Sequence, residues 1–187
     1  MASQQELNYS VSTLKKVVSF VAFQAVWFAV LMLEPFVYVP LVIAFFILHL
    51  GYIVPHRRVW LWVARIAVLG WALDSILLQL GVFNFSSGEV IPFWLLALWT
   101  MFAFVLMTSV VAFRRYALVL ALVSFISAPG TYYAGVQLKA GASFAEPLWQ
   151  SLLILGVAWG IFVPFVMTLV NRDSLLSKPQ REVSEEA

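Results

Sequence analysis

One acidic residue, Asp74, lies well inside a long apolar run and is the first candidate for chemistry. A carboxylate surrounded by hydrocarbon must be neutralised, hydrogen-bonded or hydrated. Two roles are open: Asp74 could relay protons, or it could make a structural hydrogen bond that ties the third apolar run to the fifth. The candidate partners at its depth are Ser75, Thr100, Thr131, Tyr132 and Tyr133.

A second polar set lies nearer the other end of the apolar runs. At about 1.5 Å per helical residue, His49 and Arg65 fall at the same depth, which predicts a polar layer. In the simpler alternative, Arg65 extends to the membrane surface and His49 donates a hydrogen bond to a backbone carbonyl. Other polar residues fall at comparable depth: Gln24, Thr108, Ser109 and Ser124.

No catalytic template accompanies these residues. The sequence has no Gly-x-Ser-x-Gly, no Gly-x-x-x-x-Gly-Lys-Ser/Thr and no His-Glu-x-x-His, which are the patterns that carry common hydrolytic and phosphate chemistry. It has two histidines and no cysteine, so thiolate chemistry is excluded. We predict no catalytic residue, no metal site and no cofactor; whether the protein is an enzyme stays open, with a non-enzyme favoured.

The fifth apolar run carries a predicted helix break at Pro129-Gly130. Proline removes a backbone hydrogen bond and clashes with the preceding turn, so the helix should kink there. Freed carbonyls at membrane depth are tolerated only where protein or trapped water satisfies them. We therefore expect this segment to face the interior near Asp74, and the two together form the best candidate site for a ligand.

The composition requires a membrane around these residues. The chain has 187 residues, of which 63% are hydrophobic and 11% charged, against about 25% charged in soluble proteins. Its net charge of +2 offers no phosphate-neutralising surface, so nucleic acid is not an expected partner. The expected partners are membrane lipids.

Runs of about 20 apolar residues predict transmembrane helices, and charges, prolines and glycines divide this chain into six. We predict an all-α, six-helix membrane domain over residues 17–171, built as three hairpins, with a polar tail at 1–16 and a charged tail at 172–187. The predicted spans are Val17–Leu33, Phe36–Val54, Val59–Leu80, Pro92–Phe113, Tyr116–Leu138 and Pro147–Val170.

Basic residues indicate the orientation, because cytoplasmic flanks hold the excess of lysine and arginine. With six spans, nine of the eleven basic residues fall on one side. The exceptions are Arg65, within a span, and Lys139, on the opposite side. Both tails are therefore expected in the cytoplasm, with the protein in the inner membrane of a bacterium.

Tryptophans and glycines have simpler interpretations. Trp99 and Trp159 fall near mid-membrane, where we interpret them as packing or lipid-facing bulk. Gly156 and Gly160 form a Gly-x-x-x-Gly pair that permits close helix approach. Packing within one chain is the favoured interpretation of this pair, and a homodimer stays possible.

Several segments resemble a known family. The segments are Leu73-Asp74-Ser75, Gly81-Val82-Phe83, Pro92 to Trp99, and Ala128-Pro129-Gly130-Thr131-Tyr132-Tyr133-Ala134-Gly135. They resemble the bacterial inner-membrane family of unknown function numbered twenty-eight seventy-eight. The resemblance implies six helices and an association with fatty-acyl modification of membrane lipids, but no activity. Its fifth-helix signature usually reads Gly-Pro, whereas Ala128 precedes Pro129 here.

Three functions follow from the sequence. The first is an accessory or binding protein for membrane lipid or for a lipid-modifying enzyme. The second is a small transporter that uses Asp74 and the broken fifth helix. The third is an intramembrane enzyme that uses His49 with Arg65.

Overall fold

The computed structural model describes residues 11–54, 57–86, 88, 91–139 and 141–172. These residues form six α-helices, one π-helical turn (η1), one 3-10 turn (η2) and two short strands, so the predicted helical class is confirmed. The elements are α1 Thr13–Met32, α2 Pro35–Leu48, η1 His49–Ile53, α3 Arg57–Gln79, β1 Phe83–Phe85, α4 Phe93–Thr108, η2 Val110–Phe113, α5 Ala117–Leu138, β2 Ala142–Phe144 and α6 Leu148–Arg172.

Helix α1 begins inside the predicted N-terminal tail. Ser12 is its N-cap, and the Ser12 side chain accepts a hydrogen bond from the Lys15 amide at 3.5 Å, which satisfies one free donor of the first turn. The Lys15 ammonium donates to the Tyr52 carbonyl of η1 at 2.6 Å, which joins the start of α1 to the end of the second span. Residues 1–10 and 173–187, most of both predicted tails, lie outside the described residues.

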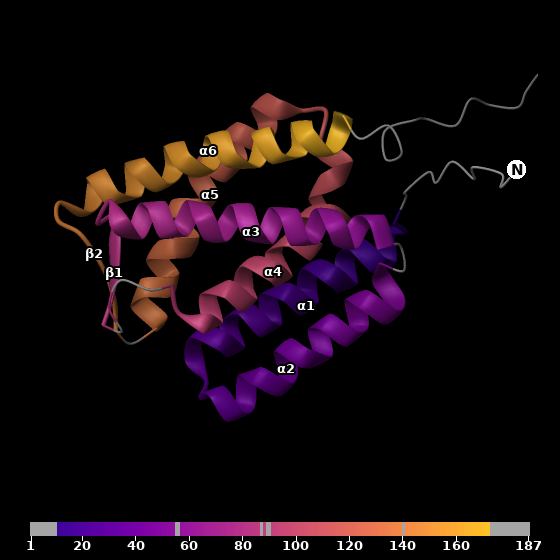
Figure 1. Cartoon of the computed structure of the whole chain (residues 1–187), viewed down its shortest axis with the longest axis horizontal. Coiled ribbons are helices and arrows are strands. Elements are labelled where there is room, and N and C mark those ends of the chain that lie inside the picture. The colour runs from indigo at the N-terminus through magenta and orange to yellow at the C-terminus, as the bar shows by residue number, and fades with distance from the viewer. Residues whose placement is uncertain (1–10, 55–56, 87, 89–90, 140, 173–187) are drawn as a thin grey trace, which may run out of the picture.

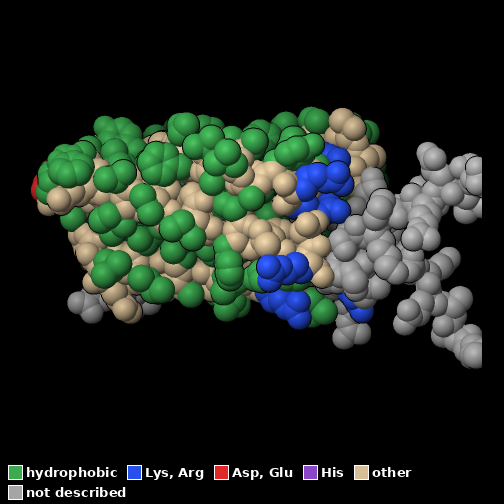
Figure 2. Space-filling view, turned by 90° about the horizontal axis from the view of Figure 1, so that it is seen from above, with side chains coloured by type: hydrophobic (Ala, Val, Ile, Leu, Met, Phe, Trp, Pro, Cys, Tyr) green, Lys and Arg blue, Asp and Glu red, His purple; other side chains and the backbone are tan. Residues whose placement is uncertain are grey.

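Five segments are long and apolar enough to cross a membrane, and the chain is a multi-pass membrane protein. The segments are Thr13–Met32, Pro35–Ile53, Arg58–Gln79, Ala117–Leu138 and Leu148–Arg172. Helix α4 has only 16 residues, and after Ser109 the chain continues into η2. Figure 2 shows apolar side chains over most of one face, with lysine and arginine gathered at one end.

The helices run back and forth between two ends of the molecule (Figure 1). Successive helices pack as α1 with α2, α3 with α4, and α5 with α6, as the predicted hairpins require. We call one end the basic end; it carries Lys15, Lys16, Arg114, Arg115 and Arg172. The opposite end carries β1 and β2, and we call it the strand end.

Helix α4 is the centre of the bundle. Nine of its 16 residues are buried, compared with three of 22 in α5. It packs against both α1 and α3. A helix enclosed by protein in this way can position side chains inside the membrane, whereas most of α5 faces outward.

The helix is not interrupted at Pro129-Gly130, since α5 continues as one helix from Ala117 to Leu138 with Pro129 inside it; the kink expected there stays a prediction. Proline deprives the carbonyl four residues earlier, that of Phe125, of its amide partner. That carbonyl lies against α6, where a Cβ at Gly156 would be only 2.9 Å from its oxygen. Close packing with a glycine therefore covers the freed carbonyl without unwinding the helix.

The same contact explains the Gly-x-x-x-Gly pair. A Cβ at Gly160 would lie 3.3 Å from the Ala121 carbonyl oxygen and 3.4 Å from the Phe125 side chain. Both glycines therefore pack α6 against α5 of the same chain, the favoured interpretation from the sequence.

Two loops pair at the strand end, which the sequence did not predict. Strand β1 pairs antiparallel with β2, with Phe83 opposite Phe144 and Phe85 opposite Ala142. The Ser86 amide adds a hydrogen bond to the Gly141 carbonyl at 2.7 Å. The loop between α3 and α4 is thus joined to the loop between α5 and α6.

Candidate functional site

Asp74 is completely buried, and both of its carboxylate oxygens are hydrogen-bonded. The Trp99 indole N–H donates to Oδ2 at 2.6 Å, and the Tyr132 hydroxyl donates to Oδ1 at 2.5 Å. The donors come from α4 and α5, so Asp74 joins three helices. The expected bond from the third apolar run to the fifth is present, with Tyr132 as the partner.

A glycine makes room for this arrangement. The Trp99 ring lies directly on Gly70 of α3, and a Cβ at Gly70 would overlap its ring carbons. On its other side, Trp99 stacks against Trp159 of α6, with ring centroids 4.9 Å apart and planes 17° apart. The indole that binds Asp74 is therefore held between a glycine and a second indole.

The other predicted partners do not hydrogen-bond to Asp74. Ser75 donates to the Trp71 carbonyl, Thr100 to the Leu96 carbonyl and Thr131 to the Ser127 carbonyl, each within its own helix. Two further candidates, Tyr133 and Gly130, lie on the exposed side of α5, and Pro129 is partly buried.

His49 forms a second buried cluster, between α1, α2 and α4 near the basic end. Its Nε2 lies 2.9 Å from the Ser19 hydroxyl, which lies 2.8 Å from the Thr108 hydroxyl. Its Nδ1 lies 2.8 Å from the Phe45 carbonyl oxygen. Since a carbonyl only accepts, Nδ1 carries a proton, as the simpler prediction for His49 requires.

The hydroxyls of this cluster can reverse their hydrogen bonds. With a neutral His49, Thr108 donates to Ser19 and Ser19 donates to Nε2. With a charged His49, Nε2 donates to Ser19, Ser19 donates to Thr108, and Thr108 donates to the Phe104 carbonyl, 2.9 Å away. Every polar atom of the cluster has a partner in both states, because each hydroxyl can donate or accept.

The rest of the predicted polar layer does not assemble around His49. Arg65 is exposed, and its guanidinium lies 5.1 Å from the Trp62 ring centroid. The Ser109 hydroxyl donates to the Lys16 carbonyl at 3.1 Å. Ser124 donates to carbonyls of α5 and to that of Trp159. Of the predicted set, only Thr108 belongs to the hydrogen-bonded cluster of His49. Gln24 lines a separate cavity.

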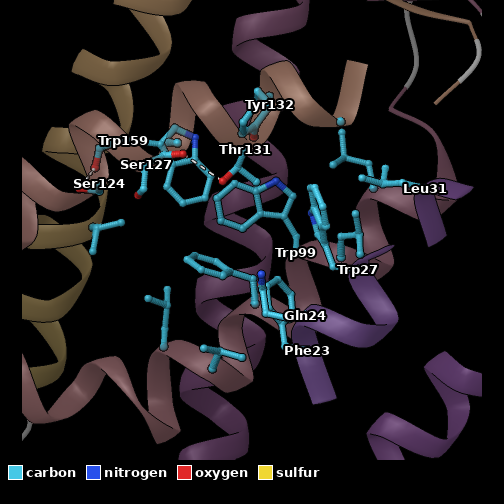
Figure 3. A pocket seen from close by; sticks show the side chains of 18 of the residues that line it. Phe23, Gln24, Trp27, Leu31, Trp99, Ser124, Ser127, Thr131, Tyr132 and Trp159 are labelled. Carbon is cyan, nitrogen blue, oxygen red and sulfur yellow. Dashed lines mark hydrogen bonds between the residues drawn. The ribbon is translucent and has the colours of Figure 1, made fainter. Parts of the chain in front are cut away.

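That cavity has a volume of about 540 Å³ and is enclosed by α1, α4, α5, α6 and the two strands. Ten of its 27 lining residues are aromatic. Figure 3 shows Phe23, Gln24, Trp27 and Leu31 of α1 opposite Ser124, Ser127, Thr131 and Tyr132 of α5, with Trp99 between them. The Asp74 cluster thus forms part of the wall through its two donors, Trp99 and Tyr132.

The cavity opens between α1 and α5. Phe20 of α1 and Val123 of α5 line it at this side and are 52% and 58% exposed. At this depth the outer surface of a membrane protein meets lipid. A molecule dissolved in the bilayer can therefore reach the cavity sideways without passing through water.

The described residues offer little else for chemistry. They contain no group of three His, Asp or Glu side chains that could hold a metal ion. His49 and Asp74 lie in separate clusters with no hydrogen bond between them. The cavity is the feature best suited to a ligand, since such sites have volumes of about 300–1,000 Å³ and mostly apolar walls.

Sequence reasoning missed Trp99, Gly70, Ser19 and the cavity. A tryptophan at membrane depth carries no pattern that shows a polar role, so the sequence predicts only packing or lipid-facing bulk at Trp99. Its spacing held a signal, since Asp74 and Trp99 lie at similar depth on helices joined by one short loop. A cavity has no signature in a single sequence.

The chain belongs to the family described as protein of unknown function DUF2878, whose model matches residues 16–165. The resemblance noted from the sequence is thereby confirmed over most of the membrane domain. No curated protein and no solved structure matches the chain.

Proposed function

We propose that this protein binds a membrane lipid by taking its hydrocarbon part into the cavity between α1 and α5. The observation that carries the proposal is the cavity itself: it is about 540 Å³ in volume, lined by apolar and aromatic side chains, and open toward the lipid-facing surface. A cavity of about 150 Å³ holds one benzene, so this one has room for a substantially larger molecule.

We further propose six membrane crossings with both tails in the cytoplasm of a bacterial inner membrane. The support is the basic end, where lysines and arginines gather, together with the helix starts and ends in Figure 1. Helix α4 would cross with η2 as its continuation. A lipid held in the cavity could then be presented to a lipid-modifying enzyme, the accessory role expected from the resemblance.

No specific observation favours the transporter or the enzyme. Asp74 has no exposed surface, and both of its oxygens are occupied. Arg65 lies on the surface, away from the buried His49. The site supports binding best.

The test uses the full-length protein in vesicles that contain a phosphatidylglycerol with a photoreactive diazirine in the middle of one acyl chain. After illumination, mass spectrometry identifies the labelled residues. Binding in the cavity predicts label on Phe102, which is partly buried in its wall. Lipid around the protein labels Phe36, which is 80% exposed, and this label is the internal control.

Two glycines of α5 provide matched variants. A Cβ at Gly135 or at Gly130 meets no atom within 4 Å, but only Gly135 lines the cavity. We expect Gly135→Phe to fill the cavity and remove the label from Phe102, and Gly130→Phe to retain it. Label confined to Phe36 and similar surface residues in the unaltered protein would refute the proposal.

A further inference from the structure

The cavity carries polar groups halfway through the membrane that a plain hydrocarbon chain would leave unpaired. Gln24 is the twelfth residue of the 20-residue α1, so its amide lies near mid-membrane. Within the part of the chain that the structure describes, this amide makes no hydrogen bond, although it lines the cavity. An amide without a partner in hydrocarbon is unfavourable, because it has lost its bonds to water.

The opposite side of the opening also carries a polar side chain without a hydrogen-bond partner in the described part of the chain. Ser127 and Thr131 of α5 line the cavity one turn apart and are exposed at its mouth. The Thr131 hydroxyl donates to the Ser127 carbonyl, whereas the Ser127 hydroxyl makes no hydrogen bond among the described residues. Figure 3 shows Gln24 on one side of the open space and Ser127 and Thr131 on the other.

These side chains can pair with acceptor atoms of a ligand from two sides. The Gln24 amide has two N–H donors and Ser127 has one O–H donor, so acceptors on two sides of one ligand group would pair with both helices. The indole N–H of Trp159 also lacks a partner, but its nitrogen lies inside the wall and not at the cavity surface.

The aromatic walls specify the shape of that group. Phe23 and Phe102 contact each other, with ring centroids 5.9 Å apart, and both line the cavity together with Trp27 and Trp99. Flat rings pack well against the faces and edges of such side chains. The ligand therefore combines a flat ring, two acceptors and enough hydrocarbon to enter from the bilayer.

We propose that the cavity binds an isoprenoid quinone, with its ring between α1 and α5 at the level of Gln24. One ring carbonyl accepts from the Gln24 amide and the other from the Ser127 hydroxyl, while the isoprenoid tail occupies the apolar remainder of the cavity or leaves through the opening. This inference rests on the proposed function, because it names the class of lipid that the same cavity takes.

The test compares two probes with the same tail: a decyl-substituted benzoquinone and decylbenzene, which lacks the carbonyls. Isothermal titration calorimetry on the full-length protein in detergent micelles measures both affinities. We expect the quinone to bind about tenfold more tightly or better, since a hydrogen bond contributes about a factor of five and two are formed. Equal affinities would overturn the quinone assignment.

Variants test the assigned partners. Gln24→Leu and Ser127→Ala should each weaken quinone binding about fivefold and leave decylbenzene binding unchanged. Gln137→Leu is the matched control, because Gln137 is exposed on α5 and does not line the cavity. Quinone affinity that is insensitive to both Gln24→Leu and Ser127→Ala would also overturn the assignment.

Failure of the two proposals can be distinguished. If decylbenzene binds as tightly as the quinone and Gly135→Phe abolishes both, the quinone assignment fails and lipid binding in the cavity stands. If neither probe binds the unaltered protein and the diazirine lipid leaves Phe102 unlabelled, both proposals fail.

Discussion

The Asp74 and His49 clusters are both buried and polar, but they differ in how freely their hydrogen bonds can change. Both oxygens of Asp74 are occupied, Oδ2 by the Trp99 N–H of α4 and Oδ1 by the Tyr132 hydroxyl of α5. His49 meets hydroxyls that can reverse direction. The rigid cluster supplies two cavity walls, Trp99 and Tyr132, whereas no residue of the His49 hydrogen-bonded cluster lines the cavity. Of the two buried polar clusters, only the Asp74 cluster therefore contributes to the cavity.

The largest effect should come from Asp74→Leu, which leaves the Trp99 N–H and the Tyr132 O–H without their acceptor. Each buried donor without a partner costs about 1–3 kcal/mol, so we expect a loss of about 2–6 kcal/mol in the free energy of unfolding. Chemical unfolding in mixed micelles measures this loss. Ser75→Ala is the control, because Ser75 bonds only within its own helix. A loss no larger than that of Ser75→Ala would remove the proposed contrast with His49.

Gly70→Ala tests whether the cavity wall depends on the position of the Trp99 ring as well as on its hydrogen bond to Asp74. The added methyl group overlaps the Trp99 ring, and overpacking of this kind costs about 1–3 kcal/mol. We also expect the diazirine label on Phe102 to change, because Trp99 must move. Gly130→Ala, where a Cβ meets no atom within 4 Å, should leave both stability and labelling intact.

His49→Leu should cost less, about 1–2 kcal/mol, because Ser19 and Thr108 can still bond each other and the Phe104 carbonyl. The same unfolding measurement applies. Labelling of Phe102 should not change, since the cluster does not line the cavity. A His49→Leu variant that loses this label would show that the two clusters are coupled.

The smallest change in stability should come from Lys139→Met. The Lys139 ammonium donates to the Val30 carbonyl of α1 at 2.9 Å and lies 5.3 Å from the Tyr38 ring centroid. At this partly exposed position we expect a loss of about 1 kcal/mol or less. Because Lys139 joins α5 to α1 at one end of the cavity opening, lipid exchange should accelerate, which stopped-flow dilution of a fluorescent lipid measures. Gln137→Leu is the matched control and should show unchanged exchange.

Much of this could be predicted from the sequence because the bilayer restricts depth. Apolar runs predicted the helices to within a few residues, and the need to pair Asp74 predicted five candidate partners, of which Tyr132 is one. The depth of a residue in the membrane does not, however, predict the direction in which its side chain points from the helix axis. Arg65 shares the depth of His49 yet faces outward, and Gln24 faces the cavity while Ser19, on the same helix, faces His49.

The continuity of α5 at Pro129 could not be predicted for a different reason. Sequence rules describe what proline does to its own helix, and they leave open whether the helix is interrupted or only kinked. Here a neighbouring helix decides the outcome, because Gly156 packs against the Phe125 carbonyl that proline leaves free. Packing between residues far apart in the sequence, like that of Trp99 on Gly70, cannot be predicted from the spacing of residues within one helix.

The pairing of β1 with β2 has a mechanical consequence. It staples the α3–α4 hairpin to the α5–α6 hairpin at the strand end, so these four helices form one frame. The α1–α2 hairpin is outside that pairing. It packs against α4, through contacts that include the Ser19–Thr108 hydrogen bond, and Lys139 joins it to the end of α5. The opening through which a lipid would enter therefore lies beside the one hairpin that no strand pairing among the described residues joins to the other four helices.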